Sequence, residues 1–130
     1  MAGTITQTHS KIGKIGVITF TCTADASDGS FPSTTVDDAI EGKLLALETN
    51  PGATAPTDNW DVVINDAEGA DVLQGAGANR DTTTTEKAGI FFSGTSSHPP
   101  VDKTDTLTLV ITGNSVNSAV VVVKLYYEKL

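Results

Sequence analysis

The sequence predicts an all-β fold: a single-domain antiparallel β-sandwich, with a jelly-roll strand order as one form it can take. Of the 130 residues, 20 are threonine, and β-branched residues fit a pleated sheet better than a helix. Several segments alternate apolar and polar residues with the period of two that a half-buried strand requires. The chain length suits one hydrophobic core rather than two, so we expect residues 15–130 to form one domain.

The N-terminal segment, residues 1–14, is predicted to be an arm or an edge strand. Its sequence "TITQTH" (residues 4–9) is short and polar, which favours an arm that becomes ordered against a partner. Such a segment can add a strand to a neighbouring subunit through backbone hydrogen bonds. Thr4, Ile5 and Thr6 are therefore candidate protein-interface residues.

The clearest strand follows at residues 18–24, where Ile18, Phe20, Cys22 and Ala24 share one face and threonines the other. After it, the turn-rich segment 25–42 contains at most one short helix, near residues 34–41. Ser33 or Thr34 can cap that turn, and Gly42 suits its end.

Further strands are predicted from "KLLALETN" (43–50), "WDVVIND" (60–66) and "AGIFF" (88–92). Trp60 is interpreted as a core anchor at the start of its strand. Gly69 predicts a tight turn between two strands, and residues 75–87 are predicted to form a long exposed loop.

Residues 104–128 contain two apolar strands around the polar patch 113–115. The residues predicted to face the core are Leu107, Leu109, Ile111, Ala119, Val121, Val123, Leu125 and Tyr127. We expect the two strands to pair as an antiparallel hairpin. Val120 and Val122, on the opposite face, are also apolar, so we expect the last strand to be covered there too. Another chain is one source of that cover, which makes both valines interface candidates.

The charge and cysteine content exclude several classes of function. The net charge of −8 repels phosphate backbones and anionic headgroups, so we expect neither a nucleic-acid nor a membrane partner. No apolar run approaches the roughly 20 residues of a membrane helix. The single cysteine, Cys22, has no intrachain partner and is predicted to be a buried core residue.

No segment carries a recognisable catalytic or cofactor-binding pattern. Asp66, Glu68 and Asp71 surround the Gly69 turn and offer oxygen ligands for a cation, but the spacing departs from a calcium loop and favours a plain hairpin. His9 and His98 lie in no nucleophile motif, and "GAGANR" (75–80) lacks the rest of a phosphate loop. We therefore assign no catalytic, cofactor or metal site and expect the protein not to be an enzyme.

Three stretches carry a resemblance to a known group: "TNPGATAPTDNWDV" (49–62), "GAGANR" (75–80) and "LTLVITGNSVNSA" (107–119). With the residues around them, they resemble small structural proteins of tailed-bacteriophage virions. The resemblance extends over nearly the whole chain. It implies a non-enzymatic component, made in the host cytoplasm and present in many copies on the particle.

Within that group, the leading expectation is a capsid decoration or cement protein that binds the major capsid protein and stabilises the head shell. We expect a homo-oligomer, with a trimer favoured over a larger ring. A head-tail connector or a tail component is the first alternative. The second is a carbohydrate-binding or host-adhesion module, for which the aromatic residues on offer are Trp60, Tyr126 and Tyr127.

Overall fold

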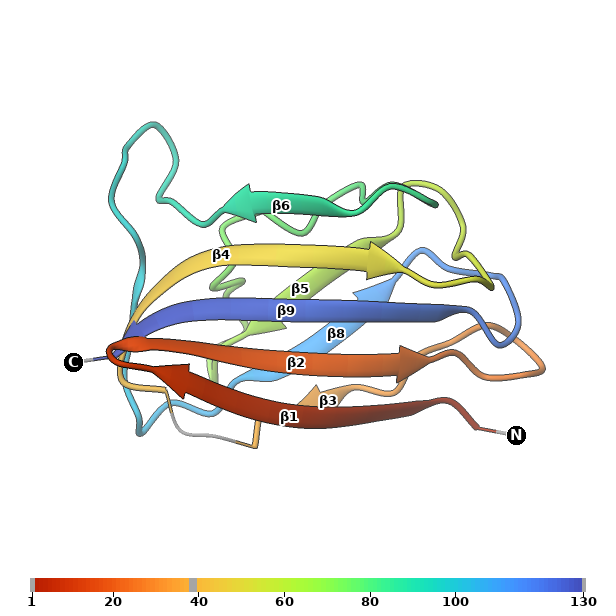
Figure 1. Cartoon of the computed structure of the whole chain (residues 1–130), viewed down its shortest axis with the longest axis horizontal. Coiled ribbons are helices and arrows are strands. Elements are labelled where there is room, and N and C mark those ends of the chain that lie inside the picture. The colour runs from red at the N-terminus through yellow and green to blue at the C-terminus, as the bar shows by residue number, and fades with distance from the viewer. Residues whose placement is uncertain (1, 38–39, 130) are drawn as a thin grey trace.

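Two antiparallel sheets face each other in the computed structural model, which describes residues 2–37 and 40–129 (Figure 1). The strands are β1 (Thr4–Ile12), β2 (Ile15–Thr23), β3 (Thr34–Thr35), β4 (Gly42–Pro51), β5 (Asp61–Asn65), β6 (Glu86–Gly89), β7 (Pro100–Val101), β8 (Thr108–Thr112) and β9 (Val120–Lys129). The larger sheet has the order β1-β2-β9-β4-β6, and β7 pairs with the start of β4. The smaller sheet has the order β3-β8-β5. This arrangement confirms the predicted all-β sandwich.

The core lies between the two sheets and consists of the residues that alternation places on the inner faces. Ile18, Phe20 and Cys22 of β2 are fully buried. The same holds, to within a few per cent of exposure, for Leu107, Leu109, Ile111, Ala119, Val121, Val123, Leu125 and Tyr127. Trp60 is also fully buried, which confirms its interpretation as a core anchor. Each large apolar side chain buried in this way stabilises the fold by roughly 1.5–3 kcal/mol.

The N-terminal segment is an edge strand and not the arm that its polar sequence favoured. All 9 residues of β1 pair with β2. The Gln7 side chain also ties β1 to the smaller sheet, since its Nε2 donates to the Thr35 carbonyl at 2.8 Å and its Oε1 accepts from the Asp37 amide at 2.9 Å. Because its backbone is paired within the same chain, this segment is part of the folded domain.

The predicted hairpin between the last two strands is wrong, although their buried faces are correct. β8 lies between β3 and β5 in the smaller sheet, whereas β9 lies between β2 and β4 in the larger one. The link 113–119 joins the two sheets around the end of the sandwich, with most of its residues exposed (Figure 1). Asn114 holds this link, since its Oδ1 accepts from the Thr57 amide at 2.9 Å and its Nδ2 donates to the Gly29 carbonyl at 2.7 Å. The two apolar faces therefore pack against each other across the core.

Two loop predictions also need correction. Residues 34–35 form β3 and no helix occurs in the described part of the segment 34–41; residues 38–39 lie outside it. The turn at Gly69 is confirmed, because Gly69 has a φ of 89° and its amide donates a hydrogen bond to the Asp66 carbonyl at 3.0 Å. The second strand expected after this turn does not form: in the described residues, the two sides of the turn are joined by a single isolated bridge between Asn65 and Asp71. The chain then folds back as consecutive turns that bury Leu73.

Candidate interaction surfaces

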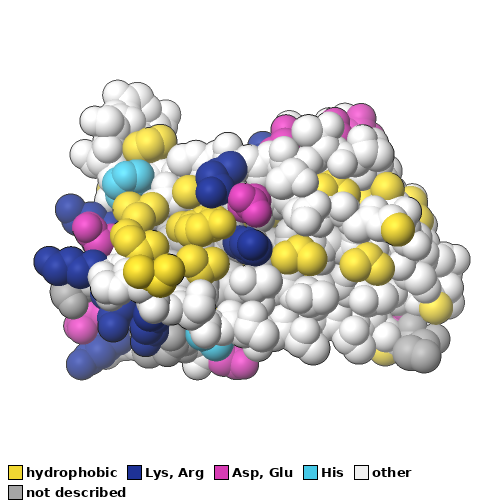
Figure 2. All heavy atoms as spheres, in the orientation of Figure 1, with side chains coloured by type: hydrophobic (Ala, Val, Ile, Leu, Met, Phe, Trp, Pro, Cys, Tyr) yellow, Lys and Arg dark blue, Asp and Glu magenta, His cyan; other side chains and the backbone are white. Residues whose placement is uncertain are grey.

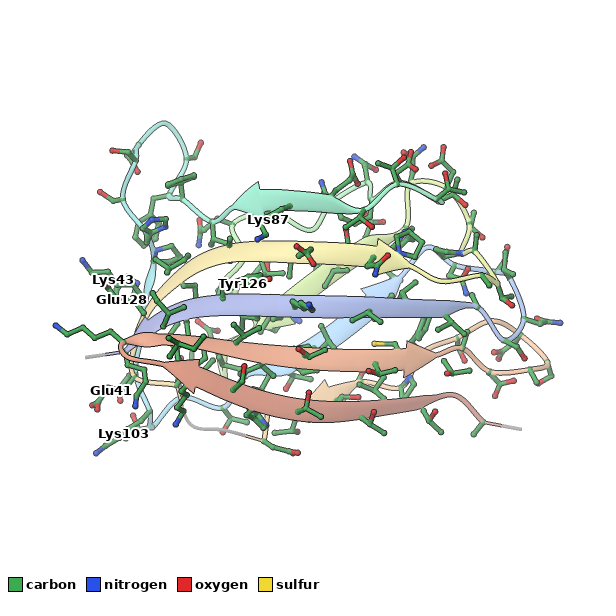
Figure 3. All side chains as sticks on the ribbon, viewed as in Figure 1. Glu41, Lys43, Lys87, Lys103, Tyr126 and Glu128 are labelled. Carbon is green, nitrogen blue, oxygen red and sulfur yellow. The ribbon has the colours of Figure 1, made fainter. Side chains whose placement is uncertain are left out.

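The outer face of the larger sheet is an ordered surface of cross-strand rows. Lys124 of β9, Glu48 of β4 and Lys87 of β6 form one row through its centre. The Lys87 Nζ lies 3.6 Å from the Glu48 Oε1 and 4.3 Å from the centroid of the Tyr126 ring, on the same face (Figure 3). Figure 2 shows this charged row separating two apolar regions of the face. The row thus divides the outer face into two separate apolar surfaces.

The first surface contains Val120 and Val122, both half-buried on the outer side of β9. The Val120 backbone pairs with its own chain: the Gly52 amide donates to its carbonyl at 2.6 Å, and its amide donates to the Thr54 carbonyl at 2.9 Å. Val122 lies between Thr21 and Asn50 in the neighbouring strands. Gly52 also lies against the Val120 side chain, but Val120 and Val122 both remain half-buried, so both stay candidates for contact with a partner.

The three candidates on β1 differ in what they offer a partner. Ile5 is half-buried and packs against the core, so its side chain is already occupied. Thr4 and Thr6 are exposed. The side of β1 that faces away from β2 pairs with no strand in the described residues. The backbone of this edge and the two threonines are thus the groups that a partner can reach.

The second apolar surface lies at one end of the larger sheet and was missed by the sequence analysis. In the described ranges, the exposed large apolar side chains are Ile12 (84%), Ile15 (38%), Phe91 (40%) and Phe92 (41%). Phe91 stacks on the His98 ring, with the centroids 4.8 Å apart and the planes at 25°. The His98 Nδ1 lies 2.7 Å from the Ile90 carbonyl oxygen, which fixes the aromatic pair beside β6.

The acidic turn uses its carboxylates to hold its own backbone. The Asp66 Oδ1 accepts from the Glu68 amide at 3.0 Å and from the Ala70 amide at 2.9 Å. The Asp71 carboxylate accepts from the amides of Leu73 at 2.9 Å and Gly75 at 3.0 Å. Among the residues that the structure describes, no three metal-ligating side chains come together. The geometry assigns these acids a structural role in the turn.

Several side chains that catalysis or sugar binding would use are buried. Burial raises the pKa of the Cys22 thiol to about 12, and a neutral thiol is a poor nucleophile. The Trp60 ring is enclosed and its Nε1 donates to the Asp81 carbonyl at 3.0 Å. Tyr127 is 2% exposed. Of the three aromatic residues considered for sugar stacking, Tyr126 alone reaches the surface.

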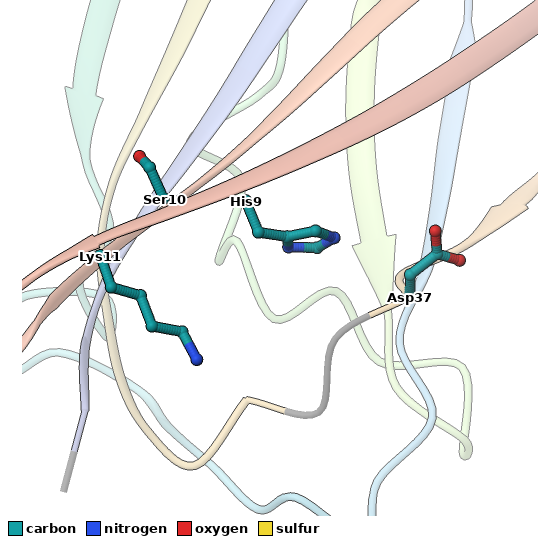
Figure 4. A pocket seen from close by; sticks show the side chains of 4 residues that line it. All are labelled: His9, Ser10, Lys11 and Asp37. Atoms are coloured by element: carbon teal, nitrogen blue, oxygen red, sulfur yellow. The ribbon is translucent and has the colours of Figure 1, made fainter.

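A hollow beside β1 is formed by His9, Ser10, Lys11 and Asp37 (Figure 4). All four residues are exposed. Ligand pockets in proteins enclose most of the ligand and have a largely apolar lining. This hollow is open and polar, so it is a surface depression rather than a binding cleft.

Comparison of the chain with protein-family models, curated proteins and solved structures found no match. The described residues include no helix of the length and apolar character needed to cross a membrane. A functional assignment therefore depends on the sequence resemblance together with the β1 edge and the outer face of the larger sheet.

Proposed function

We propose that this protein is a non-enzymatic structural component of a tailed-bacteriophage virion, a decoration or cement protein on the outside of the head. It binds the major capsid protein and stabilises the shell. The sequence resemblance supports the class of protein. The observation that supports docking is the β1 edge, which is 9 residues long and contains neither proline nor an irregular pairing.

An edge of this kind exposes backbone amides and carbonyls that can pair with a strand of another protein. Proteins protect such edges with proline, bulges or charges, and β1 carries one lysine, Lys11. Backbone pairing supplies affinity, and the exposed Thr4 and Thr6 supply fit to the partner strand. A subunit of this type strengthens a lattice by making many small contacts.

The function is tested by adding the purified protein to phage particles that lack its gene. We expect saturable co-sedimentation with the heads and a higher temperature of DNA release from the particles. Binding to isolated tails or to the head-tail junction alone would favour the connector or tail alternative. Failure to bind any part of the particle would contradict the proposal.

A pair of lysine substitutions tests the role of the β1 edge. Thr6 and Thr21 are cross-strand partners and both are exposed, but only Thr6 belongs to the edge strand. We expect Thr6→Lys to reduce binding to the heads and Thr21→Lys to preserve it, with unchanged thermal stability of both free proteins. An equal loss of head binding in both variants would indicate that the capsid contacts the outer face of the sheet. Binding of both variants as strong as that of the wild type would exclude the β1 edge.

A further inference from the structure

The smaller sheet has an incomplete edge beside β8. On one side, β5 pairs with all 5 residues of β8, from Thr108 to Thr112. On the other side, β3 is 2 residues long and pairs with Thr108 and Leu109 alone. In the part of the chain that the structure describes, no strand lies beside the rest of β8 on that side. β8 therefore ends with a short stretch of open edge.

The backbone of Ile111 points toward this open edge. Ile111 pairs with Val62 of β5, and the Val62 amide donates away from β8, to the Gly77 carbonyl at 2.8 Å. Facing residues of an antiparallel pair either exchange two hydrogen bonds or both turn away from each other, so the Ile111 amide and carbonyl point to the β3 side. Just before β8, the Leu107 carbonyl accepts on that side from the Val36 amide at 2.9 Å. Among residues 2–37 and 40–129, Ile111 has no such bond.

Pro32 explains why the chain leaves this edge open. β3 pairs Thr34 with Leu109, and continuing that register would place Pro32 opposite Ile111. Proline has no amide hydrogen to donate, so the chain's own residues cannot complete the two hydrogen bonds of this pair. The Pro32 carbonyl instead accepts from the Thr34 hydroxyl at 3.1 Å. The Ile111 backbone is therefore available to a partner.

A hollow of about 400 Å³ lies beside this open edge, between segments 29–33 and 110–114. Its size falls within the range of ligand pockets in proteins. Phe31 and Val110 are both half-buried and form its apolar part. The Asn114 Nδ2 joins the two segments by donating to the carbonyl of residue 29 at 2.7 Å. None of the described residues that line the hollow is charged. This hollow, called the β8 hollow, combines apolar side chains with unpaired backbone groups.

The unpaired backbone selects an extended peptide as the ligand. A peptide residue opposite Ile111 can accept from the Ile111 amide and donate to the Ile111 carbonyl, as in strand addition. Segment 29–33 bounds the hollow, so a chain end or a single loop fits where the edge of a whole sheet does not. The ligand is therefore a short segment and not a strand already built into a sheet.

Charge and shape disfavour other occupants. Acidic side chains lie next to the β8 hollow: Asp28 precedes Gly29, and the Asp61 carboxylate lies beside Gly113. They repel an acidic segment. A second copy of the chain is disfavoured because both copies carry a net charge of −8. A sugar would stack on an exposed aromatic ring, whereas Phe31 is half-buried and packs against the core.

We propose that the β8 hollow binds a short extended segment without charged side chains, which is a chain end or loop of a different protein. One residue of the segment pairs with the Ile111 backbone, and an apolar side chain of the segment contacts Phe31 and Val110. The contact goes beyond the function proposed above and does not depend on it, because it uses the smaller sheet and not the β1 edge.

Nuclear magnetic resonance of the ¹⁵N-labelled protein tests this binding. The probe is a capped five-residue peptide of alternating threonine and valine, and the control is the same peptide with its internal amides N-methylated. We expect the probe to shift the amide signals of segments 29–33 and 110–114 saturably. The methylated peptide keeps the side chains but lacks the donors, so it should bind at least roughly fivefold more weakly.

Several results of this titration would overturn the inference. They are absent shifts, shifts confined to other segments, and equal affinities for the two peptides. Stronger binding of maltose at the same signals would identify a sugar site instead. Shifts of these signals with protein concentration alone would identify a second copy as the occupant.

Hydrogen exchange reports on the pairing of Ile111 directly. Backbone groups of successive strand residues point to opposite sides, so the Val110 amide faces β5 and is paired in the free protein. We expect the Ile111 amide to exchange faster than the Val110 amide, and the saturating probe peptide to slow Ile111 exchange at least roughly fivefold. An Ile111 amide as protected as Val110 without peptide, or unchanged by the peptide, would contradict the inference.

A matched pair of tyrosine substitutions locates the site. Ser33 and Thr35 are both exposed and lie two positions apart on one face, but only Ser33 lines the β8 hollow. We expect Ser33→Tyr to abolish the saturable shifts and Thr35→Tyr to preserve them, with both proteins folded in their amide spectra. Equal affinity of wild type and Ser33→Tyr for the probe peptide would place the peptide elsewhere and overturn the inference.

Discussion

Replacement of Thr49 by valine is predicted to stabilise the protein. Thr49 lies on β4 and is 1% exposed, and its hydroxyl oxygen has no hydrogen-bond partner among the described residues. In the sheet it lies between Val123 of β9 and Glu86 of β6. Burial of a hydroxyl without a hydrogen bond costs about 1–3 kcal/mol, and valine replaces it with a methyl group of similar size. We therefore expect the free energy of unfolding to rise by about 1 kcal/mol or more.

Urea denaturation and thermal melting measure this change. At about 2.1 cal/mol/K of unfolding entropy per residue, 1 kcal/mol corresponds to a shift in Tm of about 4 °C for a chain of this length. Thr49→Ser keeps the hydroxyl and loses the buried methyl, so it should destabilise the protein by about 1 kcal/mol. A Thr49→Val protein less stable than wild type would refute the reasoning, because the hydroxyl would then have a partner such as a buried water.

Three further predictions concern the core, the thiol and an acidic loop. Phe20→Ala should lower the free energy of unfolding by about 3–5 kcal/mol and Thr21→Ala by less than about 1 kcal/mol; equal losses in urea would contradict the assigned faces. Because the pKa of Cys22 is raised by burial, its contribution to stability is lost as the pH rises above about 9, and Cys22→Ala should lack this loss in melts between about pH 7.5 and 10.5. Backbone amides lower the pKa of Asp81, so its contribution is present above about pH 4 and lost as the pH falls. Asp81→Asn should flatten the acid side of the stability profile, and an unchanged profile would contradict this role.

The faces of the strands were predictable because they depend on local alternation. Ile18 and Phe20 are buried and Thr19 and Thr21 are not, as the period of two requires. The same reasoning placed Leu109 and the other inner residues of β8 and β9 correctly. Burial of one face follows from the apolar pattern itself, so no knowledge of the neighbouring strands was needed.

The partners of the strands were not predictable from the same pattern. A link such as 113–119 is long enough either to close a hairpin or to connect the two sheets around the end of the sandwich, and the apolar faces of β8 and β9 suit both arrangements. The interactions that decide are distant in sequence, such as Asn114 with Thr57 and Gly29. The polarity of "TITQTH" likewise suggested an arm, although an edge strand tolerates polar residues because one side and one face meet solvent.

The candidate interaction surfaces were likewise only partly predictable from the sequence. Thr4 and Thr6 are exposed on an edge, as an interface requires, whereas Val120 is half-buried and its backbone pairs with the chain's own residues 52–54. The exposed apolar surface that contains Ile12, Ile15 and Phe91 had no signal in the sequence. Ile15 and Phe91 are far apart along the chain, and only the order of strands in the larger sheet brings their segments to the same end.

A reconstruction of whole particles, with and without the gene for this protein, tests the central claim most directly. We predict additional density on the outer surface of the head shell that accommodates the sandwich, with the β1 edge turned toward the major capsid protein. Additional density confined to the head-tail junction or the tail, or no difference between the two particles, would contradict the account.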